Sequence, residues 1–237
     1  MSKCPIVVEV VEMTVQEKRR DVTEALGASR SSVRVAAALR AGSNPAPHQV
    51  GPLIARCAVE PDFYVRDMLT WALIRHDRDT VVDLLLPQLA SEQAQARSQA
   101  LHTLSKIGGP RVWAAMSQDL VQDDEDEVAR AAWLTAVRVV PPGQEVRLAG
   151  MLATQFGRGS REVRISLSRA MLELGEAAAP EVRRAMSSAD DDVRTHALAT
   201  ARMIEDPNTA FDAAVEEAKR VHTLRGAPLV GNQLADR

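Results

Sequence analysis

Apolar and polar residues alternate along most of this chain with the period of an α-helix, and the helical pattern itself recurs. Each copy opens with a polar or acidic residue and Val-Arg or Ala-Arg, and an Ala- and Leu-rich run follows. Apolar residues stand one before, three after and seven after the arginine, which places them on one stripe of a helix. The arginines recur every 30–34 residues, at Arg34, Arg66, Arg97, Arg130, Arg164 and Arg194.

A second, shorter helical pattern precedes each arginine-bearing helix. Prolines and glycines separate the two, as at Gly108-Gly109-Pro110 and Pro141-Pro142-Gly143. One such helix pair cannot bury its apolar face alone, so the repeat predicts six antiparallel pairs stacked around a continuous core, an all-α right-handed solenoid. We expect the shorter helices over roughly 16–26, 48–58, 80–90, 110–121, 144–156 and 177–186.

The ends of the chain depart from the repeat. Residues 1–15 read as a loosely ordered arm, and residues 225–237 lack periodicity and read as a flexible tail. Residues 208–221 carry one apolar and one charged face, as a helix capping the last pair requires. We therefore expect a single solenoid domain over 16–224 that includes this capping helix.

The repeated segments resemble a known family. Asp-Asp-Asp-Val-Arg-Thr-His-Ala-Leu (190–198) and Glu-Val-Arg-Ile-Ser-Leu-Ser-Arg-Ala-Met-Leu-Glu-Leu-Gly (162–175) are similar to HEAT repeats of the PBS-lyase type. Pro52 and Pro180 stand fourteen residues before an arginine, as is common in that family, whereas the other four copies lack this proline. The stretches 56–73 and 96–108 resemble HEAT-repeat proteins of actinobacteria. The resemblance implies an α-solenoid and, for activity, little more than a binding scaffold.

Composition narrows the function classes. Aromatic residues make up only 3% of the chain and the net charge is −3, so the molecule as a whole offers no basic footprint for nucleic acid. No apolar run is long enough for a transmembrane helix, and residues 1–12 do not match a signal peptide, so we expect a cytoplasmic protein. The histidines and cysteines lack metal-ligand spacing, and nucleotide-binding motifs are missing. We expect no metal and no cofactor.

The arginine column has two interpretations. It could form an anion-binding stripe, or it could form a structural ladder in which each arginine bridges an acidic residue of its own or the adjacent repeat. The HEAT resemblance favours the structural ladder. The acids four residues earlier, such as Asp62, Asp126 and Asp190, are the expected partners.

The second helices carry the candidate binding residues. In HEAT arrays these helices line the concave face, and the positions two before and one, five and nine after the arginine lie opposite the core stripe. The column five after the arginine reads Trp71, His102, Thr135 and Arg169. Trp71 has two interpretations: it binds a partner on the concave face, or it packs in the seam between pairs. The candidates are Tyr64, Asp67, Trp71, Arg75, His102, Lys106 and Arg169.

The predicted function is a non-catalytic scaffold whose concave groove binds a protein or peptide segment. The alternative is a HEAT-like DNA glycosylase or nucleic-acid-binding solenoid, for which Asp67, Trp71 and Arg75 are the only matching aromatic–carboxylate–arginine trio. Such enzymes need a basic groove for phosphates, and a net charge of −3 does not provide one globally. A bilin lyase-like activity is a further alternative, and only the name of the PBS-lyase-type subclass suggests it.

Overall fold

The computed structural model describes residues 22–206, 211 and 213–216, and it divides into two compact units between Pro141 and Pro142. The boundary falls in Pro141-Pro142-Gly143, where proline removes backbone donors that a continuous helix would need. Throughout the described residues every regular element is a helix, and no strand is found. The predicted all-α class of repeated helix pairs is confirmed.

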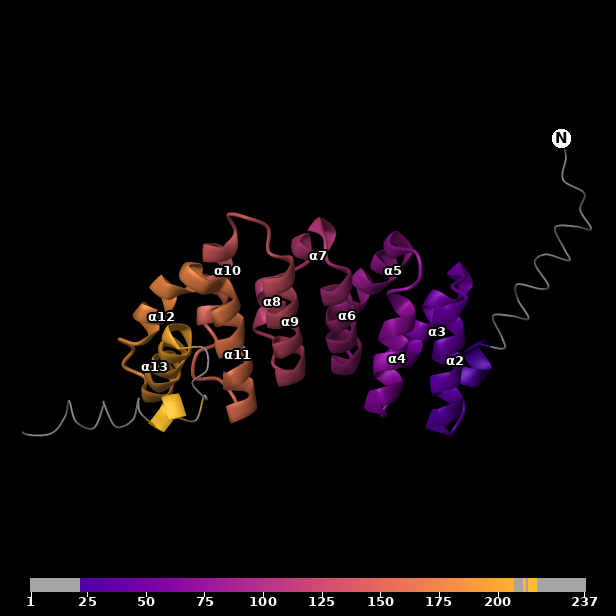
Figure 1. Cartoon of the computed structure of the whole chain (residues 1–237), viewed down its shortest axis with the longest axis horizontal. Coiled ribbons are helices and arrows are strands. Elements are labelled where there is room, and N and C mark those ends of the chain that lie inside the picture. The colour runs from indigo at the N-terminus through magenta and orange to yellow at the C-terminus, as the bar shows by residue number, and fades with distance from the viewer. Residues whose placement is uncertain (1–21, 207–210, 212, 217–237) are drawn as a thin grey trace, which may run out of the picture. The chain divides into compact units, whose positions relative to one another are not determined.

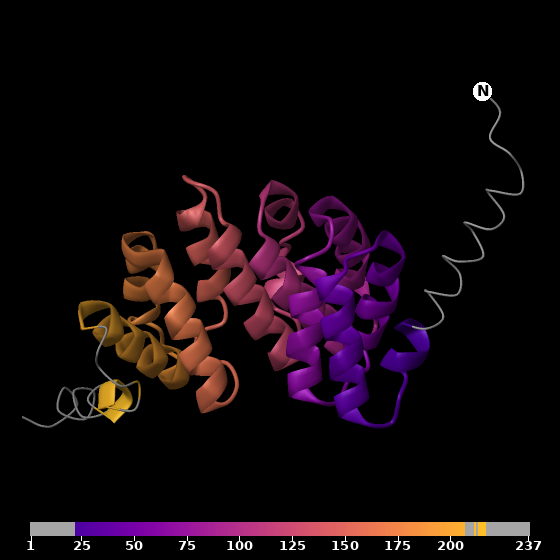
Figure 2. The same cartoon turned by 45° about the vertical axis from the view of Figure 1, so that its right-hand side comes forward.

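In the first unit, the second helices of successive pairs stand in a row (Figure 1 and Figure 2). Residues 22–26 are helical and precede the first of them. The second helices are α2 (Ser31–Ser43), α4 (Phe63–Leu73), α6 (Ala94–Ile107) and α9 (Asp126–Val139). The shorter partners are α3 (Pro47–Cys57), α5 (Arg78–Leu85) with the 3-10 helix η1 (Leu86–Ala90), and α7 (Pro110–Ala114) with α8 (Gln118–Val121).

The second unit repeats the same pairing. Its long helices α11 and α13 pack against each other, and each contacts a shorter helix. The elements are α10 (Glu145–Ala153), α11 (Arg161–Leu174), the 3-10 helix η2 (Gly175–Ala178), α12 (Ala179–Ala185) and α13 (Asp191–Glu205).

Two shorter helices expected to be continuous are interrupted, and local chemistry explains why. Pro87 follows α5, and the chain tightens there into η1 because proline cannot donate the next helical hydrogen bond. The predicted helix over 110–121 ends at Ala114 and restarts at Gln118, where the Ser117 hydroxyl accepts from the Leu120 amide as a new N-cap.

The fourth copy of the repeat is shifted by one residue relative to the sequence alignment. In the other copies the N-cap stands four residues before the arginine, as Asp62 does before Arg66. In α9 the N-cap is Glu125, so the equivalent position is Ala129 and not Arg130. The prediction that Thr135 lies on the exposed face is therefore wrong: Thr135 is fully buried, and its hydroxyl donates to the carbonyl of Leu101 on α6.

The C-terminal end of the second unit is covered by residues from the predicted capping segment. Of residues 208–221, the described ones (211 and 213–216) are helical. Phe211 and Ala214 are buried against Ala199 and Met203 of α13. The expected arm (1–15), the tail (225–237) and the remainder of the capping helix lie outside the described residues.

Candidate functional site

The exposed side of α2, α4, α6 and α9 presents equivalent residues from each repeat of the first unit. With the register of α9 corrected, the position five after the arginine holds Leu39, Trp71, His102 and Leu134. The position nine after it holds Ser43, Arg75, Lys106 and Arg138. These eight residues, with Asp67 and Ser98 one helical turn before the first column, are termed the second-helix face. Closely packed helices, such as α2 with α4 and α6 with α9, are about 8–10 Å apart, whereas α4 and α6 contact each other at only a few positions.

Trp71 combines the two roles that sequence reasoning left open. Its ring is half-buried because one edge lies against α2, where a Cβ on Gly42 would stand 2.3 Å from Trp71 Cζ3. The Arg75 guanidinium lies over the same ring, 4.5 Å from its centroid. Trp71 thus fills the α2–α4 seam and still presents part of its ring at the surface.

His102 is the point where charges from three helices meet. The imidazole is half-buried on α6, and burial lowers its pKa below the usual 6.5. Lys106 lowers the pKa further, Asp67 of α4 raises it, and Arg138 of α9 lowers it. The structure therefore brings the predicted residues Asp67, His102 and Lys106 together, and adds Arg138, which the misaligned register had concealed.

The remaining predicted residues stand apart from this cluster. Tyr64 is 77% exposed at the start of α4, and its ring packs edge-on against Phe63, which is 66% exposed, at 5.8 Å. Arg169 is exposed on α11 in the second unit. The second-helix face is consequently defined by residues of the first unit alone.

The arginines of the column donate hydrogen bonds to backbone carbonyls. In four repeats the Nη1 atom donates to carbonyls five or six residues earlier, at 2.6–3.2 Å, which ties down the turn that precedes the helix. These bonds run from Arg34 to Ala28 and Ser29, from Arg66 to Glu60 and Pro61, from Arg97 to Ser91 and Glu92, and from Arg194 to Ser188.

The acidic partners of the arginines come mostly from the next repeat. Arg34 pairs with Glu60 at 2.7 Å, Arg97 with Asp123 at 2.8 Å and Arg164 with Asp192 at 3.1 Å. The prediction of partners four residues earlier is wrong for Arg66 and Arg194, because Asp62 and Asp190 instead cap their own helices by accepting from backbone amides. Arg130, one residue out of register, pairs with Glu127 on its own helix.

Glu60 forms a buried ionic network that the sequence patterns did not reveal. Its carboxylate is fully buried and accepts from Nε and Nη2 of Arg34, from Nε of Arg56 and from the Asp62 amide. Burial raises the pKa of Glu60, but the hydrogen bonds from the two arginines and the amide outweigh it and hold the pKa at about 2. The network fixes the α3–α4 turn to the preceding repeat.

The comparisons with known proteins agree with this repeat architecture. Residues 50–138 match the family model for HEAT repeats. This part of the chain carries HEAT repeats. A search of curated protein sequences found no match.

Two solved structures have a similar arrangement of HEAT-like helices. One is an engineered protein, with 15% identity, a TM-score of 0.42 and coverage of 85% of this chain and 97% of that one. The other is human deoxyhypusine hydroxylase in complex with glycerol, with 16% identity, a TM-score of 0.42 and coverage of 91% and 99%. Similarity at this level supports no conclusion about activity.

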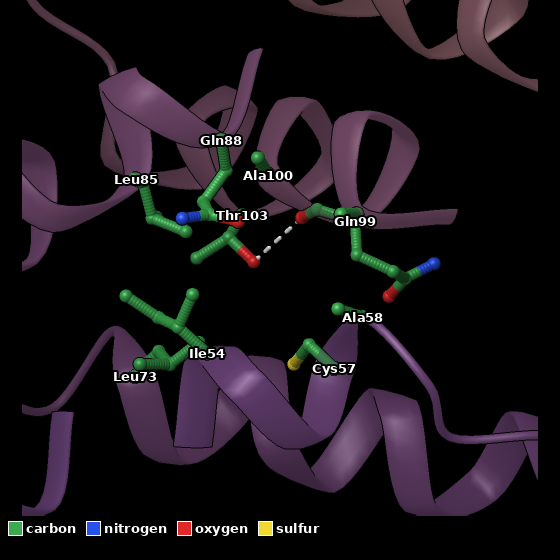
Figure 3. A pocket seen from close by; sticks show the side chains of 10 residues that line it. Ile54, Cys57, Ala58, Leu73, Leu85, Gln88, Gln99, Ala100 and Thr103 are labelled. Atoms are coloured by element: carbon green, nitrogen blue, oxygen red, sulfur yellow. Dashed lines mark hydrogen bonds between the residues drawn. The ribbon is translucent and has the colours of Figure 1, made fainter. Parts of the chain in front are cut away.

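A small cavity lies between HEAT pairs of the first unit, bounded by α3, α4, α5, η1 and α6 (Figure 3). The volume that the centre of a water molecule can occupy is about 10 Å³, which is about the amount that one water needs. Cys57 lines it and is 4% exposed, and burial raises the pKa of the thiol to about 12. Cys57 is therefore a buried packing residue, because a protonated thiol is a poor nucleophile.

The second unit has a buried histidine at its centre. The Gly157 amide donates to His196 Nδ1 at 3.1 Å, so Nε2 carries the proton and donates to the Arg164 carbonyl at 2.9 Å. Phe156 and Phe211 pack edge-on against the ring at 5.0 and 5.9 Å. Burial lowers the pKa of His196 to about 4, against an opposing effect of the Arg164 hydrogen bond. His196 is thus a neutral structural residue.

Nothing in the described residues suggests a metal centre or a membrane span. No group of three or more His, Cys, Asp or Glu residues there is arranged to hold a metal ion. None of the described helices is both long and apolar enough to cross a bilayer.

Proposed function

We propose that this HEAT-repeat chain is a non-catalytic scaffold whose second-helix face binds a segment of a partner protein. The observation that carries the proposal is the alignment of equivalent side chains from four consecutive helices. Trp71, His102 and Leu134 present half-buried rings and an aliphatic side chain at matching positions. Partly buried aromatic residues next to charged ones are typical of binding hot spots.

Three of the four charged side chains of the face are unpaired among the described residues, whereas the fourth, Arg75, lies over the Trp71 ring. Asp67, Lys106 and Arg138 make no side-chain hydrogen bond or ion pair with any residue that the structure describes. This contrasts with the buried Glu60 network and the arginine column, where the charged groups are paired within the fold. Charged side chains beside a hydrophobic column supply the specificity that complementary binding requires.

The DNA glycosylase alternative is less well supported by the same residues. In such a site the Trp71 ring would stack on a base. Here the Arg75 guanidinium lies over the ring, 4.5 Å from its centroid, and one edge of the ring packs against α2. Asp67 is exposed, so no buried pocket surrounds a catalytic carboxylate. A flipped base needs an enclosed pocket.

A random peptide library displayed on phage tests the proposal. Selected peptides are synthesised and their affinities measured by fluorescence anisotropy for the full chain, for His102→Ala and for Asp67→Ala. The matched control is Leu84→Ala, which changes a residue 42% exposed on α5, away from the face. We expect each face variant to weaken binding by about five-fold or more and the control to have no effect. Failure to select any binder, or binders indifferent to both face variants, would contradict the proposal.

A further inference from the structure

One basic residue stands at the same repeat position near the C-terminal end of three consecutive second helices: Arg75 in the turn after α4, Lys106 on α6 and Arg138 on α9. Arg75, Lys106 and Arg138 all lie nine residues after the arginine position of their repeat and are all exposed. They are therefore expected to form a row along the face, here termed the basic row. This row becomes apparent only after the register of α9 is corrected, because the uncorrected alignment places Val139 there.

The basic row places three cations along one face although the chain has a net charge of −3. Asp67 is the acid that opposes it at His102, and Glu127 of α9 is paired with Arg130. Two members of the row, Lys106 and Arg138, lower the pKa of the His102 imidazole, which shows that charges from α6 and α9 act at one place on the surface. A ligand that complements this surface is negatively charged.

The repeat spacing selects the conformation of that ligand. Helices α6 and α9 pack closely, at about 8–10 Å, so Lys106 and Arg138 are separated by about that distance. Arg75 follows α4, which contacts α6 at only a few positions. A polyproline II helix advances about 9.3 Å in three residues and returns to the same side, because it has three residues per turn at 3.1 Å each. A β-strand does not match, because residues three apart point to opposite sides and residues two apart span only about 6.7 Å.

We infer that the second-helix face takes an extended acidic protein segment in the polyproline II conformation, with Asp or Glu three residues apart opposite Lys106 and Arg138 and a further acid opposite Arg75. The inference rests on the proposed function and specifies its partner class. Trp71 and His102, in the adjacent column, would contact the residues between the acids. The row also has a purely structural explanation, since basic residues near helix C-termini complement the helix dipole. That explanation predicts an effect on stability and none on binding.

Defined probes test the inference with the full chain. The first is a fluorescein-labelled peptide of four Glu-Pro-Pro repeats, and the second has the same composition with its glutamates in one block. A third replaces Glu by Gln, and a labelled single-stranded DNA of about twelve nucleotides serves as the nucleic-acid probe. Anisotropy is measured at low salt, where exposed charges act most strongly. We expect the spaced peptide to bind about five-fold or more tightly than the block peptide, and the Gln peptide to lose binding.

Substitution of the row provides the second arm. Arg75→Gln, Lys106→Gln and Arg138→Gln should each weaken the spaced peptide by about two- to five-fold, and the triple variant by about ten-fold or more. Arg183→Gln, which removes an exposed arginine of α12 in the second unit, is the matched control and should bind as wild type. Urea unfolding of each variant shows whether the row acts on stability instead.

The outcomes separate the inference from the function it builds on. Equal binding of spaced and block peptides, or wild-type binding by the triple variant, overturns the inference. Library-selected peptides that depend on His102 and Asp67 but lack spaced acids overturn it while leaving the proposed function intact. Tighter binding of the DNA probe, lost in the triple variant, identifies nucleic acid as the occupant and overturns both.

Discussion

Replacing Glu60 by Gln tests the energetic role of the buried network. The substitution keeps the shape of the side chain and removes its charge, so Arg34, which is 5% exposed, loses its counter-ion. The pKa of Glu60 falls from the ordinary 4.5 to about 2 on folding. At about 1.4 kcal/mol per pKa unit, this difference stabilises the folded state by about 3 kcal/mol at neutral pH. Leaving a buried charge unpaired costs about 3–5 kcal/mol, so the two arguments agree.

The assay is urea unfolding followed by tryptophan fluorescence. All three tryptophans, Trp71, Trp113 and Trp133, belong to the first unit, so the signal reports the unit that contains Glu60. We expect Glu60→Gln to lower the free energy of unfolding at pH 7 by about 3 kcal/mol. Glu92→Gln, an exposed position of the same unit, is the control and should change it by less than about 0.5 kcal/mol.

The pH dependence supplies a further check on the same reasoning. Because the folded pKa of Glu60 is depressed, its contribution is fully present above pH 4.5 and is lost as the pH falls from 4.5 toward 2. The difference between wild type and Glu60→Gln should therefore shrink in that range. A variant within about 1 kcal/mol of wild type at pH 7, or a difference that does not change with pH, would refute the account of the network.

Three further substitutions have expected outcomes. Gly42→Ala should destabilise the first unit by about 1–3 kcal/mol in the same fluorescence assay, because the new Cβ would lie 2.7 Å from Trp71 Cε3 and 2.9 Å from the Ala72 backbone; unchanged stability would show that the seam has room. The second unit should lose about 3 kcal/mol between pH 6.5 and 4 in urea unfolding followed by circular dichroism, because protonation of His196 is favoured in the unfolded chain, and His196→Gln should flatten that dependence. Phe211→Ala should cost about 3 kcal/mol by the same measurement, because the ring is 7% exposed and packs on His196; a negligible loss would show that the segment does not cap α13.

The fold was largely predictable from the sequence because the repeat consists of residue types that favour helices. Alternating apolar positions and proline–glycine breaks identified the second helices. The register of the fourth copy was not predictable, because Arg130 matches the repeated arginine although the buried Ala129 holds the equivalent position. The N-cap, Glu125, is also one of several adjacent acids. Alignment on the arginine therefore placed Thr135 on the surface, where hydrogen bonding and burial exclude it.

The site was predictable in part. Asp67, Trp71, Arg75, His102 and Lys106 were identified from helical periodicity, which depends only on positions within one helix. Contacts between residues of different repeats could not be predicted from this periodicity. The choice of Glu60 as the partner of Arg34 depends on how one turn packs against the preceding pair, and a single acid in a loop has no periodic signal. The same limit concealed the close approach of Trp71 to Gly42.

Site-specific photo-crosslinking tests the central claim, that the second-helix face is where a partner binds. A photoreactive benzoylphenylalanine is placed at Ser98, on the face of α6 one turn before His102, and in a separate variant at Leu84 on α5. Each is irradiated with a library-selected peptide, and the products are identified by mass spectrometry. The account predicts a crosslink from position 98 and none from position 84. A crosslink from position 84 alone, with none from position 98, would contradict it.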